Sequence, residues 1–132
     1  MDSVSIAVDN RKKIIIFRLR GNASSGDMAD KAQVAYDSVE QPWAYNRLID
    51  LRNFTSLLAY EDIERMAEQW AEVCHGRECL TKTAVVNPDT LSVARAKAYG
   101  HLFPNVEIKV FTCFDEALDW LTPAAPALAK RA

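Results

Sequence analysis

The feature of this sequence that most constrains its fold is a regular alternation of strand-like and helix-like segments after Tyr45. A short apolar run is followed by a helical pattern three times. The third of these pairs is a strand pattern at 106–112 and a helix pattern at 114–121. Such alternation is typical of a parallel sheet covered by helices. The pattern constrains the architecture far more than it constrains the chemistry.

Two more strands are predicted before this region, which brings the total to five. In the first of them, Val4, Ile6 and Val8 alternate with polar or small residues, as in a half-buried strand. Because only a short turn separates it from the next apolar run, the two strands should pair antiparallel, and the later strands should run parallel. The predicted strands are residues 4–8, 14–19, 47–51, 83–86 and 106–112.

Four helices are predicted between and after these strands. The first begins at Ser24 or Ser25, either of which is a suitable N-cap, and ends near Val39. The second begins near Tyr60 and buries a stripe that includes Trp70. The third starts at 87–88, where Asn would cap the helix and Pro would occupy its first turn, and the fourth covers 114–121.

The order of these elements predicts one α/β domain over residues 1–122, followed by an Ala/Pro-rich tail at 123–132. Within the domain we expect the order ββαβαβαβα and a mixed five-stranded sheet with one antiparallel edge strand. A chain of this length can bury enough surface to be stable as a single core.

Three segments resemble a known family: Leu48-Ile-Asp-Leu-Arg52, Ala84-Val-Val-Asn-Pro-Asp89 and the ending 110–121. Together with the element order, they resemble the STAS fold of sulfate-transporter tails and anti-sigma-factor antagonists. More narrowly, residues 4 to about 121 resemble the SpoIIAA-like family of small bacterial proteins, which is related in shape to CRAL-TRIO lipid-binding domains. The resemblance implies a binding or regulatory module, and its lipid-binding relatives imply an apolar ligand as the alternative.

The sequence departs from the regulatory STAS antagonists at the start of the second helix. Those antagonists carry a phosphorylatable Ser or Thr there, whereas residues 57–63 contain no Ser, Thr or Gly. Thr55 and Ser56 lie a few residues upstream and are interpreted as loop residues. We therefore do not expect a phosphorylation switch of the familiar kind.

The bulk properties exclude several classes of partner. A net charge of −2 and a pI near 5.7 give no basic surface for nucleic acid. The chain lacks an apolar stretch of the ~20 residues that span a bilayer, and residues 1–5 do not resemble a secretory signal. Three cysteines without a framework spacing predict a reduced, cytoplasmic protein.

No metal, cofactor or catalytic residue is expected. The segment from Cys74 and His75 to Cys79 supplies only one loose cluster, whereas zinc usually needs two short-spaced pairs. Cys74 also falls on the apolar stripe of the second helix, where cysteine packs as a small hydrophobe. No nucleophile, phosphate-loop or dinucleotide motif occurs, so we do not expect an enzyme.

Ligands of open α/β sheets collect beyond the carboxyl ends of the strands. That edge would carry the candidate ligand-binding residues Asp50, Arg52, Asn53, Asn87, Asp89 and Thr112. The interpretation that we favour is that Asn87 and Asp89 cap the third helix and that 50–52 only order a loop, because caps account for most of these residues. A second place to look for a ligand is a gap between the second and third helices and the sheet.

A candidate interaction surface lies at Leu57, Leu58 and Tyr60, where an aromatic ring follows two leucines in a predicted loop. This segment could equally fold back on the core. We expect a non-enzymatic STAS-like module that acts through protein–protein contact, with homodimerisation left open. The alternative is a carrier of a small apolar or lipid-like ligand. An apolar cavity would favour the carrier, and an apolar patch at this segment would favour the partner module.

Overall fold

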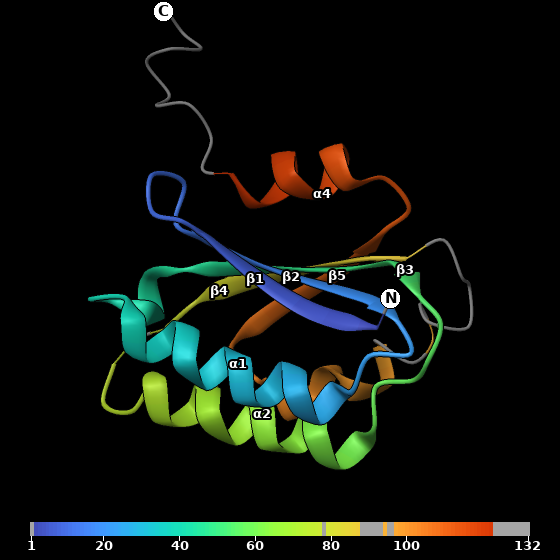
Figure 1. Ribbon diagram of the computed structural model, residues 1–132. Helices are drawn as coiled ribbons and strands as arrows, with labels where there is room; N and C mark the ends of the chain where they lie inside the picture. Colours follow the sequence, from blue (N-terminus) through green and yellow to red (C-terminus); the bar gives the residue numbers. More distant parts are fainter. Residues whose placement is uncertain (1, 78, 88–93, 95–96, 123–132) are drawn as a thin grey trace, which may run out of the picture.

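The computed structural model describes residues 2–77, 79–87, 94 and 97–122, in which one five-stranded sheet separates two helical layers (Figure 1). The strands lie in the order β1-β2-β3-β4-β5. Their bounds are β1 (Ser3–Asp9), β2 (Ile14–Gly21), β3 (Asn46–Phe54), β4 (Thr81–Val86) and β5 (Val106–Phe111). No helix among these residues is long and apolar enough to cross a membrane.

The predicted mixed sheet is confirmed. β1 pairs antiparallel with β2, and β2, β3, β4 and β5 run parallel. The turn between the first two strands forms because the Asp9 carboxylate accepts hydrogen bonds from the backbone N–H groups of Arg11 and Lys12. β1 is therefore the antiparallel edge strand that the short link requires.

The helices lie on both faces of the sheet (Figure 1). α1 (Ser25–Ser38) and α2 (Tyr60–Val73) cover one face, and α4 (Phe114–Leu121) covers the other. Short 3-10 turns are present at η1 (Pro42–Ala44) and η2 (Gly100–Leu102). The predicted third helix begins at residues outside those described, but 97–99 are helical and lead into η2. The predicted tail at 123–132 also lies outside the described residues.

Strand alternation divides the core into two parts. Successive side chains of a strand point to opposite faces, so Arg47, Ile49 and Leu51 of β3 point toward α1 and α2, while Leu48 and Asp50 point toward α4. The larger cluster lies under α1 and α2 and includes Phe17, Met28, Ile63, Met66 and Trp70. The smaller cluster lies under α4 and consists of Ile14, Leu48, Ala84, Val86, Ala117 and Leu121.

Two adjacent serines order the start of α1, and the second of them also links it to the start of α2. Ser24 is the N-cap of α1, where its hydroxyl accepts hydrogen bonds from the N–H groups of Gly26 and Asp27. The Ser25 hydroxyl donates to Asp62 of α2 at 2.6 Å and accepts from the N–H of Ala59 at 3.1 Å. These contacts fix the end of the loop that leads from β3 into α2.

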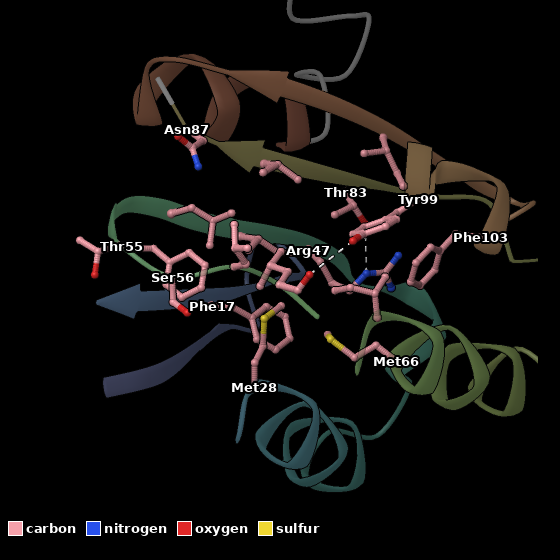
Figure 2. Close-up of a pocket in the computed structure, with 18 of the residues that line it drawn as sticks. Phe17, Met28, Arg47, Thr55, Ser56, Met66, Thr83, Asn87, Tyr99 and Phe103 are labelled. Atoms are coloured by element: carbon pink, nitrogen blue, oxygen red, sulfur yellow. Dashed lines mark hydrogen bonds between the residues drawn. The ribbon is translucent and has the colours of Figure 1, made fainter. Parts of the chain in front are cut away.

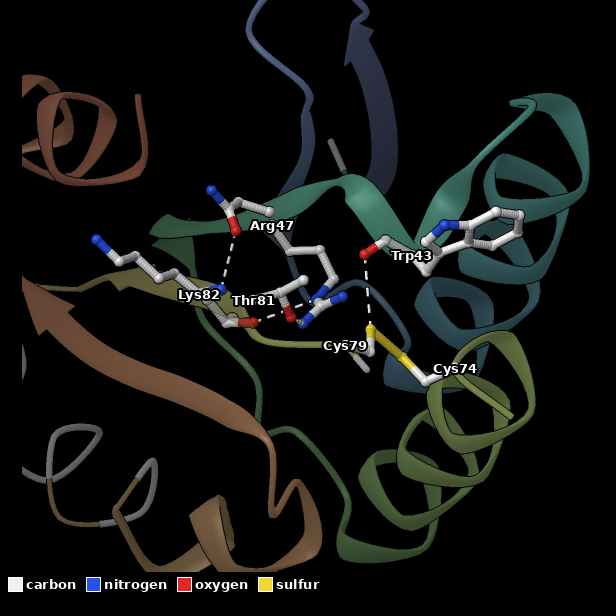
Figure 3. Close-up of a disulfide and its surroundings, with 8 residues drawn as sticks. Trp43, Arg47, Cys74, Cys79, Thr81 and Lys82 are labelled. Carbon is white, nitrogen blue, oxygen red and sulfur yellow. Dashed lines mark hydrogen bonds between the residues drawn. A yellow bond between two sulfur atoms is a disulfide. The ribbon is translucent and has the colours of Figure 1, made fainter. Parts of the chain in front are cut away.

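The prediction that all three cysteines are reduced is wrong for two of them. Cys74, at the end of α2, forms a disulfide with Cys79, which precedes β4 (Figure 3). Their Cα atoms lie 5.7 Å apart, within the range that a disulfide spans, because the chain reverses between them at Gly76. Cys113 is free and exposed. The cysteines therefore give no support for a cytoplasmic location, which stays a prediction.

Candidate functional site

A cavity of about 400 Å³ lies between the sheet and the helices α1 and α2 (Figure 2). Small-molecule sites in proteins span roughly 300–1,000 Å³, and a cavity of about 150 Å³ already holds benzene. The cavity is therefore large enough for a small organic molecule. Its apolar lining comes from the strands (Phe17, Ile49, Leu51, Phe54, Val85, Ile108), from the helices (Met28, Ile63, Met66) and from Leu57, Leu58 and Phe103.

The cavity is elongated along β3. Thr55, Ser56 and Asn87 lie at one end, beyond the carboxyl ends of β3 and β4, and Arg47 lies toward the other end with Phe103 (Figure 2). Arg47 and Phe54 are seven strand residues apart, which corresponds to about 23 Å at ~3.3 Å per residue. The site thus has a neutral polar end, an apolar middle and a charged end.

Arg47 is the charged group of the cavity, and only 4% of its surface is exposed. Its Nε donates to the Thr83 hydroxyl at 3.2 Å, and its Nη2 donates to the Thr81 hydroxyl at 3.0 Å. The guanidinium carbon lies 3.6 Å from the centre of the Trp70 ring, which gives a cation–π contact. Burial lowers the pKa of Arg47, but an arginine remains protonated at neutral pH.

The contacts of Arg47 are of the same order as the cost of burying its charge, but they leave one of its nitrogens without a partner. Moving such an ion out of water costs several kcal/mol. Each hydrogen bond to a charged group contributes about 1.5–3 kcal/mol, and a desolvated cation–π contact contributes about 2 kcal/mol. However, its buried Nη1 has no hydrogen-bond partner, and none of the described carboxylates forms an ion pair with the guanidinium.

Tyr36 of α1 adds a hydroxyl to the same cavity. Its ring lies 5.4 Å from that of Trp70, so the guanidinium and the two rings form one buried cluster. Burial raises the pKa of Tyr36, and the charge of the neighbouring Arg47 opposes this rise without cancelling it. The phenol is therefore neutral at physiological pH and can donate a hydrogen bond.

The predicted site residues Asp50 and Arg52 form a separate cluster on the α4 side of the sheet. Arg52 donates to both oxygens of Asp50 at 2.9 Å, and Arg18 approaches the same carboxylate at 3.5 Å. Both guanidiniums lie over the ring of Phe114. Burial tends to raise the pKa of Asp50, but the hydrogen bonds and charge of Arg52, with the charge of Arg18, outweigh it and hold this pKa below its ordinary value.

The structure separates the six predicted ligand-binding residues. Asn87 is buried and lines the cavity, whereas Asn53 and Thr112 are exposed and are not part of its lining. Asp89 lies outside the described residues. Strand ends share one edge of the sheet, but neighbouring residues face opposite sides, so edge position alone does not assemble a site.

Sequence reasoning did not identify the polar groups at the charged end of the cavity, which are Tyr36, Arg47 and Thr83. The available signal was Arg47 itself. It shares the inward face of β3 with the apolar residues Ile49 and Leu51, and a charge at such a position is unusual unless it is paired.

Besides α1 and α2, Tyr99 and Phe103 on either side of η2 line the cavity. The sequence suggested a gap between the second and third helices and the sheet, but most of the predicted third helix lies outside the described residues.

The predicted interaction segment lies at the rim of the cavity. Leu57 is 62% exposed and Tyr60 is 41% exposed, while Leu58 is partly buried against the core. Leu57 and Leu58 both line the cavity, and the ring of Tyr60 lies 5.6 Å from that of Tyr99. The segment is therefore both part of the cavity wall and part of the surface.

Comparison with known proteins identifies the family. The model of the SpoIIAA-like family matches residues 14–122. The chain belongs to the SpoIIAA-like family. Its fold is similar to that of an uncharacterised DUF3478-family protein with a SpoIIAA-like fold from Shewanella loihica PV-4, whose crystal structure is known. The two structures align with a TM-score of 0.61 and 17% sequence identity, over 90% of this chain and 92% of the other. No curated protein matches the chain.

Proposed function

We propose that this SpoIIAA-like protein is a non-enzymatic binding protein that holds a small, largely apolar ligand in the cavity between the sheet and α1 and α2. The observation that carries the proposal is the cavity of about 400 Å³ and its mainly apolar lining. Closely packed interiors rarely leave spaces of this size, and large apolar pockets with a few polar groups are the usual form of ligand sites.

The polar groups in the cavity favour binding over catalysis. General acid–base catalysis mostly relies on His, Asp, Glu, Lys or Cys, together with Tyr. Of these types, the described lining contains only Tyr36 and Tyr99. Hydroxyl and amide groups, which orient a ligand, make up most of the other polar positions.

Protein–protein contact remains a second candidate function because Leu57 and Tyr60 are exposed next to each other at the rim. Large exposed apolar side chains at one place are typical of interaction sites. The patch is small, however, and both leucines of this segment also line the cavity. The cavity is the larger feature, so the carrier is the function we favour.

The proposal is tested with Nile red, a neutral apolar dye whose fluorescence rises in apolar sites. We expect saturable binding at one dye per chain. Ile49→Phe, which fills the cavity, should weaken binding by at least about tenfold. Ile16→Phe is the matched control, because Ile16 is a partly buried isoleucine packed against the core under α4. Non-saturable binding, or equal loss in both variants, would reject a site in the cavity.

A further inference from the structure

Among the described residues, two charged side chains, those of Arg47 and Asp50, are deeply buried, and their surroundings differ. The Asp50 carboxylate accepts two hydrogen bonds from the side chain of Arg52 and one from its backbone N–H, and it lies close to Arg18. Arg47 has no ion-pair partner among the described residues, although it is as deeply buried. A buried ion usually has a counter-ion, and the cavity that Arg47 lines is the place where one could bind.

The groups around Arg47 can also donate hydrogen bonds to an anion. The Thr83 hydroxyl accepts from Nε, so its own hydrogen remains available to a ligand. The Tyr36 phenol lines the same cavity and is a second donor. One guanidinium and two hydroxyls match a single negative charge shared by two oxygens, as in a carboxylate.

The rest of the cavity favours an apolar chain attached to that anionic group. From Arg47 toward Leu57 the lining is mainly aliphatic and aromatic, and it carries no second charged side chain among the described residues. A doubly charged headgroup would lack the additional cation that phosphate sites commonly provide.

We propose that the ligand is an amphipathic carboxylic acid, whose carboxylate pairs with Arg47 and whose apolar chain extends along the cavity toward Leu57. This inference rests on the proposed function and goes beyond it by naming the ligand class and its anchoring residue. Arg47 acts as the specificity determinant that distinguishes an acid from an alcohol of the same length.

The test compares decanoate, 1-decanol and decyl phosphate as competitors of Nile red, with native mass spectrometry to confirm one ligand per chain. Decanoate should bind at least about tenfold more tightly than decanol, because a hydrogen-bonded charge pair supports a difference of that size. Decyl phosphate should bind more weakly than decanoate.

Arg47→Met should weaken decanoate binding by at least about tenfold and change decanol binding by less than about twofold. Arg52→Met is the control, since it removes an arginine from the opposite face. Should Arg47→Met fail to fold, Thr83→Val provides a milder test and should weaken decanoate binding by about threefold.

The outcomes separate this inference from the proposed function. If Nile red binds in the cavity but decanoate and decanol bind equally, or Arg47→Met leaves decanoate binding unchanged, the carboxylate site is rejected and the binding function stands. Tighter binding of decyl phosphate would also reject the carboxylate as the ligand class. If neither Nile red nor any decyl compound binds, both proposals fail together.

Discussion

The two faces of the sheet enclose buried charges in opposite ways. Under α4, Asp50 lies between Arg18 and Arg52 beside the smaller core cluster. Under α1 and α2, Arg47 lies against Trp70 at the end of a cavity, with two threonine hydroxyls as its acceptors. One strand, β3, supplies both residues, three positions apart.

We interpret Asp50 as a charge that stabilises the fold and Arg47 as a charge that binds the proposed ligand. A buried ion whose partners all belong to the chain has its interactions completed on folding. A buried ion that lacks a counter-ion in the chain can still form an ion pair with a ligand of opposite charge. The comparison predicts that Asp50 matters more for stability and that Arg47 matters more for binding.

The largest effect is expected on the cavity face from Trp70→Ala. Trp70 is buried and contacts both Tyr36 and Arg47, so its removal should lower the free energy of unfolding by about 3–5 kcal/mol. Trp120→Ala is the matched change on the α4 face, where Trp120 is only partly buried, and should cost less than half as much. A urea titration measures both, and a loss below about 1 kcal/mol for Trp70→Ala would contradict its role in the core.

Asp50→Asn tests the paired charge. Breaking a buried pair costs about 3–5 kcal/mol, but Arg18 and Arg52 are 37% and 42% exposed and can turn to water, so we expect about 2–3 kcal/mol. Because the folded pKa of Asp50 is lowered, its stabilisation is present above the ordinary value of 3.8 and is lost as the pH falls through the folded pKa. Urea titrations at several pH values should show that the free energy of unfolding falls less steeply with decreasing pH in the variant than in the unaltered protein.

The disulfide belongs to the cavity face and can be removed without touching either charge. Replacing Cys74 and Cys79 with Ser should lower the free energy of unfolding by about 2 kcal/mol, the loop-closure entropy of a crosslink between residues this close in sequence. The same shift should follow from dithiothreitol treatment of the unaltered protein. A reductant that changes nothing, with both thiols found free by alkylation, would contradict the bond.

The smallest stability effect is expected from Arg47→Met. The change removes a buried charge, which is favourable, but leaves the hydroxyls of Thr81 and Thr83 without their donor. We expect the free energy of unfolding to change by less than about 1 kcal/mol, well below the effect of Asp50→Asn. The comparison of the two faces fails if a urea titration gives Arg47→Met the larger loss.

Most of the fold could be predicted because each element is encoded locally. Val4, Ile6 and Val8 alternate as β1 does, the short turn after Asp9 requires antiparallel pairing, and the stripe of Ile63, Met66 and Trp70 is buried on α2. Local patterns also set approximate bounds, although β3 is longer at both ends than the apolar run that predicts it.

The site was harder to predict because it depends on which face of the sheet a residue occupies. The sequence placed Asp50 and Asn87 together at the carboxyl ends of parallel strands, yet Asn87 lines the cavity, whereas Asp50 lies within β3 and faces α4. The disulfide was missed for a similar reason, since the reversal at Gly76 brings Cys79 back to the end of α2. Both features arise from packing between segments and not from the pattern within one segment.

The edge strand β1 has a consequence for how copies of this chain can associate. Lys31 of α1 donates a hydrogen bond of 2.8 Å to the backbone carbonyl of Val4, so one acceptor of this strand is already occupied by a charged side chain. Lysine at the margin of a sheet discourages another chain from adding a strand, which protects proteins from aggregation. The β1 edge is therefore a poorer template for continuing the sheet into a second molecule than a fully open edge, and we expect a homodimer to form through another surface.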